Sequence, residues 1–256
     1  MYTVIVPIHK YDDEVKSSLN TAVESFKASN HEGDGQLLFV GPKTVIDELK
    51  KEYKGEDFLY VENEKTEFCP QINSAVDKIN TKFFSILEYD DVYTEKWFDN
   101  VKKQVLTADN VSLYLPLTEV IDYTMKDKGP IGYVNEAVWA SSFSDEIGFL
   151  DLESIQNYMN FNVTGGVFIT DDFKEVGGLK ESMKLSFWYE FLLRFMYNNK
   201  KVYVIPKVGY QHMIARPDSV SDQYNKTMSR EEADWWMELA TKEYYFKKDR
   251  NKVFGK

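Results

Sequence analysis

Three carboxylates occur within four residues of this chain, directly after an apolar segment. Residues 83–87 read FFSIL, the pattern of a buried strand, and Glu88, Asp90 and Asp91 follow. Carboxylates this close repel one another, and a bound divalent cation removes that repulsion. Oxygen ligands suit Mg²⁺ or Mn²⁺, which leave coordination positions open for phosphate oxygens and water. The cluster therefore predicts a metal site for a diphosphate, while an acidic turn at a helix start has the same pattern.

A cation at this place fits one kind of reaction. When the bond between a sugar and a nucleoside diphosphate breaks, negative charge builds up on the leaving phosphate and needs stabilisation. The sequence has no GxxxxGK[ST] phosphate loop, no GxGxxG turn, no HExxH motif and no paired CxxC. The commonest alternative nucleotide sites are thereby excluded.

The composition is that of a folded, enzyme-sized protein. The 256 residues are 43% hydrophobic, and a net charge of -11 disfavours general binding to nucleic acid. The single cysteine, Cys69, cannot form an intramolecular disulfide. No apolar run approaches the roughly 18 residues of a membrane span, and the amino terminus lacks a signal-peptide pattern. We therefore expect a soluble, cytoplasmic protein without a membrane span.

Strands and helices alternate in the part of the chain that must position the carboxylates. Strand patterns, separated by helical ones, occupy residues 3–8, 37–40, 58–61 and 83–87. Asp12 is placed to cap the first helix, which is predicted over residues 13–28. Such alternation predicts a mostly parallel, doubly wound sheet that binds ligands beyond the carboxyl ends of its strands.

The second half of the chain has fewer clear patterns. Residues 122–136 have no period and contain glycine and proline, so we predict a long loop there. Strands are predicted at 111–115 and 202–206. Helices are predicted from 184 to 198 and, with amphipathic character, from 230 to about 247.

In their order and spacing these motifs resemble a family 2 glycosyltransferase of the GT-A fold, over roughly the first 220 residues. The segments that carry the resemblance are VIVP at 4–7, Asn73, LEYDD at 87–91, TGGVF at 164–168, VGGL at 176–179, Glu190 to Arg194, YQH at 210–212 and RPDSVS at 216–221. It implies a Rossmann-like, mostly parallel central sheet flanked by helices, in one domain with a C-terminal helical extension. It further implies a nucleotide-sugar-binding half (1–115), an acceptor-binding half (116–225) and a C-terminal amphipathic helix (226–256).

The resemblance also implies which residues bind the donor. They are Pro7, His9, Asp12, Lys43, Asn73, Glu88, Asp90 and Arg216. In similar enzymes the second strand ends in an acidic residue that contacts the base. This chain has Gly41-Pro42 there instead, so Lys43 is assigned to a phosphate. UDP is the nucleotide that the resemblance favours.

For the metal, the resemblance implies Asp91 as the principal ligand with support from Asp90. Glu88 would face the ribose or the metal. His212 is a further candidate ligand through its neutral imidazole. An ordinary hydrogen-bonded histidine beside the sheet explains His212 equally well.

The catalytic base is expected at the start of the predicted helix 184–198, where inverting members carry a carboxylate. This chain has Phe187-Trp188 at that place. Glu190, inside the helix, and Asp172, after the glycine pair, are the candidates. A salt bridge from Glu190 to Arg194, four residues on, accounts for both of those residues as well.

The sequence therefore predicts a metal-dependent glycosyltransferase. It would move a sugar from a nucleotide sugar, with UDP favoured, to the hydroxyl of a glycan or another acceptor, with inversion. The alternative is a GT-A-like module that binds a sugar or a partner and has lost the chemistry.

Overall fold

The computed structural model describes residues 1–108, 110–144, 146–217, 219, 224 and 226–242. Within them lies one sheet made of β1 (Tyr2–Pro7), β2 (Gly35–Gly41), β3 (Leu59–Glu62), β4 (Phe83–Ile86), β5 (Val92–Tyr93), β6 (Val111–Asp122), β7 (Gly132–Val134), β8 (Val167–Ile169) and β9 (Lys201–Ile214). The helices are α1 (Asp13–Ser29), α2 (Lys43–Glu52), α3 (Phe68–Lys78), α4 (Trp97–Val105), α5 (Leu152–Asn157), α6 (Thr170–Glu175), α7 (Phe187–Tyr197) and α9 (Arg230–Lys242), with short 3-10 turns η1 (Tyr123–Lys128) and η2 (Glu136–Trp139).

The sheet is mixed: the neighbours from β3 to β4 run parallel as predicted, β6 and β9 also run parallel, and the other pairs are antiparallel. Its strand order is β3-β2-β1-β4-β8-β6-β9-β5, with β7 paired to β6. From β3 to β4 all neighbours run parallel. The short strand β8 is antiparallel to both β4 and β6, and β5 is antiparallel to β9. The prediction of a mostly parallel sheet is corrected here, because a strand pattern gives no direction and β8 enters without a crossover helix directly before it.

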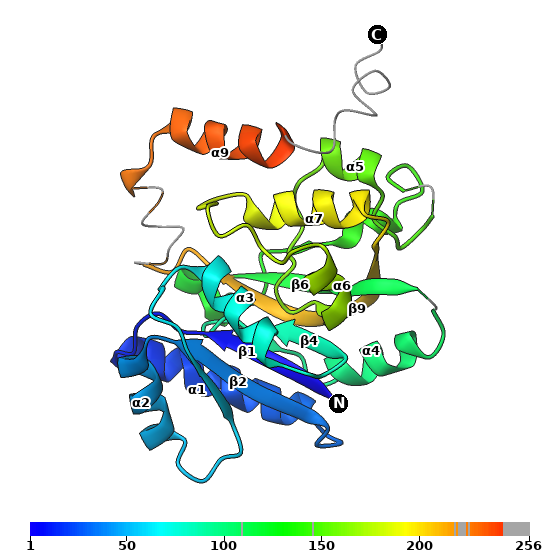
Figure 1. Ribbon diagram of the computed structural model, residues 1–256. Helices are drawn as coiled ribbons and strands as arrows, with labels where there is room; N and C mark the ends of the chain where they lie inside the picture. Colours follow the sequence, from blue (N-terminus) through cyan, green and yellow to red (C-terminus); the bar gives the residue numbers. More distant parts are fainter. Residues whose placement is uncertain (109, 145, 218, 220–223, 225, 243–256) are drawn as a thin grey trace.

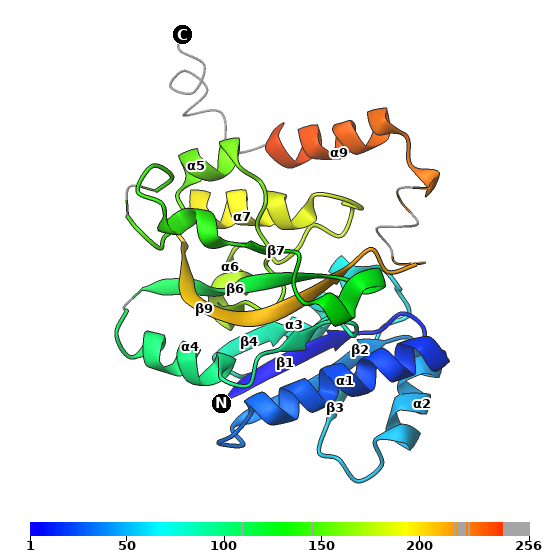
Figure 2. The same ribbon diagram turned by 180° about the vertical axis from the view of Figure 1, so that it is seen from behind.

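Helices cover both faces of the sheet (Figures 1 and 2). The apolar sides of α1, α2 and α4 pack with one face in a single buried cluster. Those of α3, α6 and α7 pack with the other face. Every residue of β1 is buried because both of its sides are covered, which explains its unbroken apolar sequence.

The predicted helix over residues 13–28 is confirmed as α1. The Asp12 carboxylate accepts a hydrogen bond of 2.9 Å from the Val15 N–H, so Asp12 is the predicted N-cap. The apolar residues Val15, Leu19 and Phe26 are buried on one face of this helix.

The predicted long loop at 122–136 is instead partly ordered. The strand predicted at 111–115 continues to Asp122, because β6 pairs in parallel with β9 as far as Asp122 and Ile214. After η1, the positive φ of 86° at Gly129 lets the chain turn back, and β7 then pairs antiparallel with β6. The pairing partner lies about 90 residues away in sequence, so no local pattern marks this extension.

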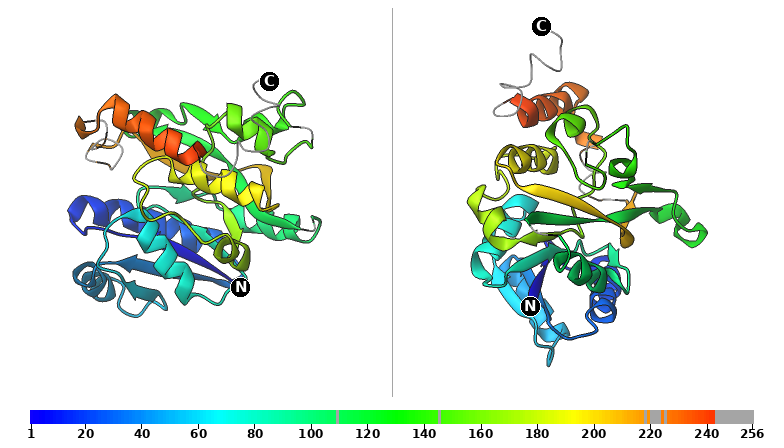
Figure 3. Two further views of the ribbon diagram at one scale, coloured as in Figure 1. Left: turned by 45° about the horizontal axis from the view of Figure 1, so that its top comes forward. Right: turned by 90° about the vertical axis from the view of Figure 1, so that its right-hand side faces the viewer.

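The carboxyl-terminal helix α9 lies along α7 on the outside of the molecule (Figure 3). Trp236 and Ala240 are buried, while Trp235 is 51% exposed. The part of the predicted helix beyond residue 242, with Tyr244, lies outside the described residues. Within the described residues, no helix has both the length and the apolar character to cross a membrane.

A glycine turn packs beneath the acidic segment. Gly165 has a φ of 79°, and a β-carbon on it would lie 2.4 Å from the ring of the fully buried Tyr210. Its carbonyl accepts a hydrogen bond of 2.9 Å from the indole N–H of Trp97. Its N–H donates to the Ile86 carbonyl at 2.9 Å. Both the backbone conformation and the lack of space therefore require glycine here.

We expect Gly165→Ala to lower the free energy of unfolding by about 2–5 kcal/mol, through left-handed strain and overpacking against Tyr210. Gly33→Ala is the matched control, because Gly33 has a φ of 66° and open space around its position. The control should lose only about 1–2 kcal/mol. Urea unfolding measures both, and equal losses would contradict the role of Tyr210.

Candidate functional site

The acidic segment lies at the carboxyl edge of the parallel strands, beside a pocket of about 220 Å³. The Leu87 N–H donates to the Ile5 carbonyl at 2.9 Å, which continues the pairing of β4 with β1. The next N–H, that of Glu88, donates to the Tyr210 hydroxyl at 3.1 Å. Strands β1 and β9 thus fix the position of the backbone at the start of the acidic segment.

Asp91 is 1% exposed and is held by β9. One carboxylate oxygen accepts a hydrogen bond of 2.7 Å from the Met213 N–H. The other lies 3.0 Å from the Nδ1 atom of His212. Burial disfavours the imidazolium of His212, but the carboxylates of Asp91 and its neighbours outweigh burial and raise the His212 pKa to about 9.

Glu88 is half-buried at the edge of the pocket. Burial and the charge of Asp91 raise its pKa to about 8. In the part of the chain that the structure describes, no hydrogen bond or ion pair engages its carboxylate. The site therefore contains a carboxyl group whose charged form its own surroundings do not favour.

Glu88, Asp91 and His212 together have the donor atoms of a cation site. One ligand atom from each lies within 4.8 Å of the others. Two carboxylates and an imidazole suit Mn²⁺, and the carboxylates suit Mg²⁺. Of the metal ligands predicted from sequence, Asp91 and His212 belong to this group and Asp90 does not. Glu88, which was expected to face the ribose or the metal, is its third member.

Asp90 is paired with a cation of the chain itself. Its carboxylate accepts a hydrogen bond of 2.7 Å from Nε of Arg216. The same guanidinium hydrogen-bonds the Tyr89 hydroxyl, lies over the Tyr89 ring at 5.0 Å, and approaches Glu14 at 3.5 Å. Burial and Asp91 raise the Asp90 pKa even so. Arg216 lines the pocket, as predicted for a phosphate-binding residue, and its guanidinium is hydrogen-bonded to Asp90 there.

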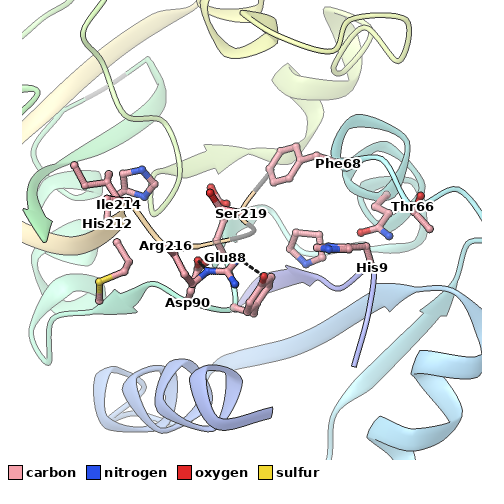
Figure 4. A pocket seen from close by; sticks show the side chains of 14 residues that line it. His9, Thr66, Phe68, Glu88, Asp90, His212, Ile214, Arg216 and Ser219 are labelled. Atoms are coloured by element: carbon pink, nitrogen blue, oxygen red, sulfur yellow. Dashed lines mark hydrogen bonds and ion pairs between the residues drawn. The ribbon is translucent and has the colours of Figure 1, made fainter. Parts of the chain in front are cut away.

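Two predicted donor residues, Pro7 and His9, line the pocket (Figure 4). Burial, followed by the charges of Lys10 and Arg216, lowers the pKa of His9, so its imidazole is neutral at pH 7. Thr66 and Phe68 lie near His9, on the side of the pocket away from His212.

Sequence reasoning missed Thr66, Phe68 and Gln71 in the pocket wall. Their signal was positional, because they follow β3, whose carboxyl end lies at the same edge of the sheet as that of β1.

Three other predicted donor residues are engaged elsewhere and do not line this pocket. Asp12 caps α1. Lys43 is exposed and forms ion pairs of 3.4 and 3.6 Å with Asp47 and Glu62. The Asn73 amide bonds both the N–H and the carbonyl of Leu179, at 2.9 and 2.8 Å, and so fastens the chain after Gly178 to α3. The segment RPDSVS is described only in part, since 218, 220 and 221 lie outside the described residues.

The two candidate bases also lie outside the pocket. Glu190 is 1% exposed and receives hydrogen bonds of 2.8 and 2.9 Å from Arg194, with Lys180 at 3.2 Å. Arg194 further donates to the Gly178 carbonyl at 2.7 Å. Asp172 pairs with Lys200 at 2.7 Å. The salt bridge weighed for Glu190 is therefore present, and it is buried rather than exposed.

A parallel half-sheet that ends in clustered carboxylates, joined to a mixed half that supplies the facing histidine and arginine, is similar in fold to solved structures of S. aureus TarS. The crystal structure of S. aureus TarS 1–349 in complex with UDP-GlcNAc matches with a TM-score of 0.68 at 14% identity, over 93% of this chain and 65% of that chain. TarS 1–349 in complex with UDP matches with a TM-score of 0.62 at 14% identity, over 88% and 62% of the two chains. This chain thus spans about two thirds of the length of the TarS chains that it matches. No protein-family model matches, and no curated protein sequence does.

We expect Glu190→Ala to lower the free energy of unfolding by about 3–5 kcal/mol, because it leaves the buried Arg194 without its carboxylate. Glu175→Ala is the control. Glu175 pairs with Lys200 at the surface, and its removal should cost no more than about 1 kcal/mol. Chemical unfolding of both variants measures the two losses of free energy. A Glu190→Ala protein as stable as the wild type would contradict the structural role of this pair.

Proposed function

We propose that this chain is a glycosyltransferase that moves a sugar from a UDP-sugar to an acceptor hydroxyl, with inversion. The observation that carries the proposal is the convergence of Glu88, Asp91 and His212 within 4.8 Å, beside a pocket that Glu88 and His212 line, in a GT-A-like fold. The similar TarS chain has been crystallised with UDP-GlcNAc and with UDP, which supports a UDP-sugar as donor.

Glu88, Asp91 and His212 would bind Mn²⁺ or Mg²⁺, and His212, whose pKa is raised, would lose its proton on binding. The raised pKa of Glu88 supports this assignment, because burial and the charge of Asp91 disfavour its negative form more than His212 and Arg216 favour it. When bound, such an ion stabilises the negative charge that develops on the leaving diphosphate. The Met213 N–H and His212 keep the Asp91 carboxylate oriented at that place.

Arg216 would bind the diphosphate. Its guanidinium lines the pocket and is already desolvated, so phosphate oxygens compete with Asp90 for the same N–H groups. Tyr89, stacked against the guanidinium, keeps the arginine at the pocket wall during that exchange. Pro7 and His9 would contact the base or the ribose from the end of β1.

In the reaction, the acceptor oxygen forms a bond to the anomeric carbon while the bond to the diphosphate breaks and its electron pair leaves with the phosphate. The acceptor hydroxyl gives up its proton to water as the new bond forms. We do not assign that proton to Glu190 or Asp172, since both are paired with cationic side chains away from the pocket.

The second candidate function is a binding module for a sugar or a partner. A specific observation favours it: α7 begins with Phe187 and Trp188, where the family would supply a carboxylate base, and Glu190 is buried in an ion pair. Such a protein would bind the nucleotide sugar without turning it over.

Release of UDP from UDP-sugars in the presence of Mn²⁺ separates the two functions. We expect slow donor hydrolysis by the wild-type protein and a loss of at least about 100-fold in Asp91→Asn, because that variant removes the central carboxylate. Asp77→Asn, on the exposed face of α3, is the charge-matched control and should keep the activity. Binding of UDP-sugars without release of UDP from any of them would favour the binding module.

Removal of the metal should weaken nucleotide binding. We expect UDP to raise the melting temperature in Mn²⁺ and to raise it much less in EDTA, because Glu88 and Asp91 then repel the diphosphate. Thermal unfolding with and without UDP under both conditions measures the effect. An equal shift in both would contradict the assigned cation site.

A further inference from the structure

Gln71 is a buried amide that lines the pocket and that the proposed chemistry does not use. It lies in the first turn of α3 and is 1% exposed. A buried side-chain amide carries two N–H donors and one acceptor oxygen, and each normally needs a partner. The partners of Gln71 therefore indicate which of its atoms a ligand would meet.

Main-chain carbonyls take up the donors of Gln71. Its Nε2 atom lies 3.2 Å from the Lys65 carbonyl and 3.5 Å from the Ile8 carbonyl. A carbonyl accepts and cannot donate, so the reversed amide would place its oxygen against two other oxygens. The end of β1 and the loop before α3 therefore fix the amide in one orientation.

The amide oxygen is then the atom left for a ligand. Within the described residues, no N–H or O–H group donates to Oε1 of Gln71. Oε1 is not among the fully enclosed side-chain atoms without a partner, so a ligand that enters the pocket can offer it an N–H in place of water.

The surroundings of Gln71 suit a flat heterocycle. The neutral imidazole of His9 and the ring of Phe68 lie on one side of the pocket, while the phosphate-binding Arg216 and the carboxylates of Glu88 and Asp90 lie toward His212 (Figure 4). Pro7 also lines the pocket. A nucleoside diphosphate laid across the pocket places its base on the His9 side. The neighbouring strand β2 ends in Gly41-Pro42, which offers no side-chain acceptor to that base.

We infer that Gln71 reads the nucleobase, accepting a hydrogen bond from the imide N–H of uracil and so selecting UDP over CDP. Cytosine has an unprotonated ring nitrogen at the equivalent position, which would face the amide oxygen as a second acceptor. This selection rests on the proposed function, and it adds a specificity-determining residue that the acidic cluster does not supply. A buried acceptor matched to one ligand and mismatched to another discriminates strongly.

Calorimetric titration of wild-type protein and Gln71→Met with UDP and with CDP, in Mn²⁺, tests the inference. We expect the wild type to bind UDP at least about tenfold more tightly than CDP. Gln71→Met keeps the length of the side chain and removes the acceptor, so UDP binding should weaken about tenfold while CDP binding changes little. Gln104→Met, on α4 and outside the pocket, is the matched control and should retain the wild-type preference.

The outcomes separate this inference from the proposed function. A wild-type protein that binds UDP and CDP equally, or a folded Gln71→Met protein that still prefers UDP, overturns the role of Gln71 and leaves the transferase proposal standing. A wild-type protein that binds neither nucleotide overturns both. Should Gln71→Met fail to fold, the comparison of UDP with CDP on the wild-type protein carries the test alone.

Discussion

The crowding of three carboxylates at the end of a buried strand is the constraint around which this site is built. Each is treated differently. Asp91 is satisfied by a main-chain N–H and an imidazole of β9, and Asp90 is satisfied by Arg216. Glu88 has its backbone anchored by Tyr210, while its carboxylate faces the pocket with a raised pKa. A bound cation would favour the charged form of Glu88, since a low-dielectric surrounding magnifies every unpaired charge.

The features that sequence could predict are those set by nearby residues. The strand at 83–87, the helix capped by Asp12 and the alternation that makes the first half of the sheet parallel all follow from periodicity and capping within a few residues. The acidic motif could be placed at the sheet edge for the same reason. The meeting of Asp91 with His212 followed from the resemblance, since the pair is separated by 121 positions.

The remaining features depend on partners distant in the chain. The insertion of β8 between β4 and β6 and the extension of β6 along β9 are decided by pairing, which a single segment does not encode. Glu190 is buried and forms one half of an internal ion pair with Arg194. Asn73, which was predicted to bind the nucleotide sugar, instead holds the chain in place at Leu179. Gln71 was overlooked because an isolated glutamine has no motif. Its significance comes from the two carbonyls that restrain it.

Strand β9 supplies Tyr210 beneath Glu88 and both His212 and Met213 to Asp91, all from one stretch of four residues. The amino-terminal half contributes the carboxylates, and the carboxyl-terminal half contributes the groups that hydrogen-bond and neutralise them. An isolated fragment ending before β9 would expose the surface of the Trp97 ring that packs against Gly209 and leave two acids uncompensated. During synthesis on the ribosome, the acidic edge therefore stays incomplete until nearly the whole domain has emerged, and the two halves mature together.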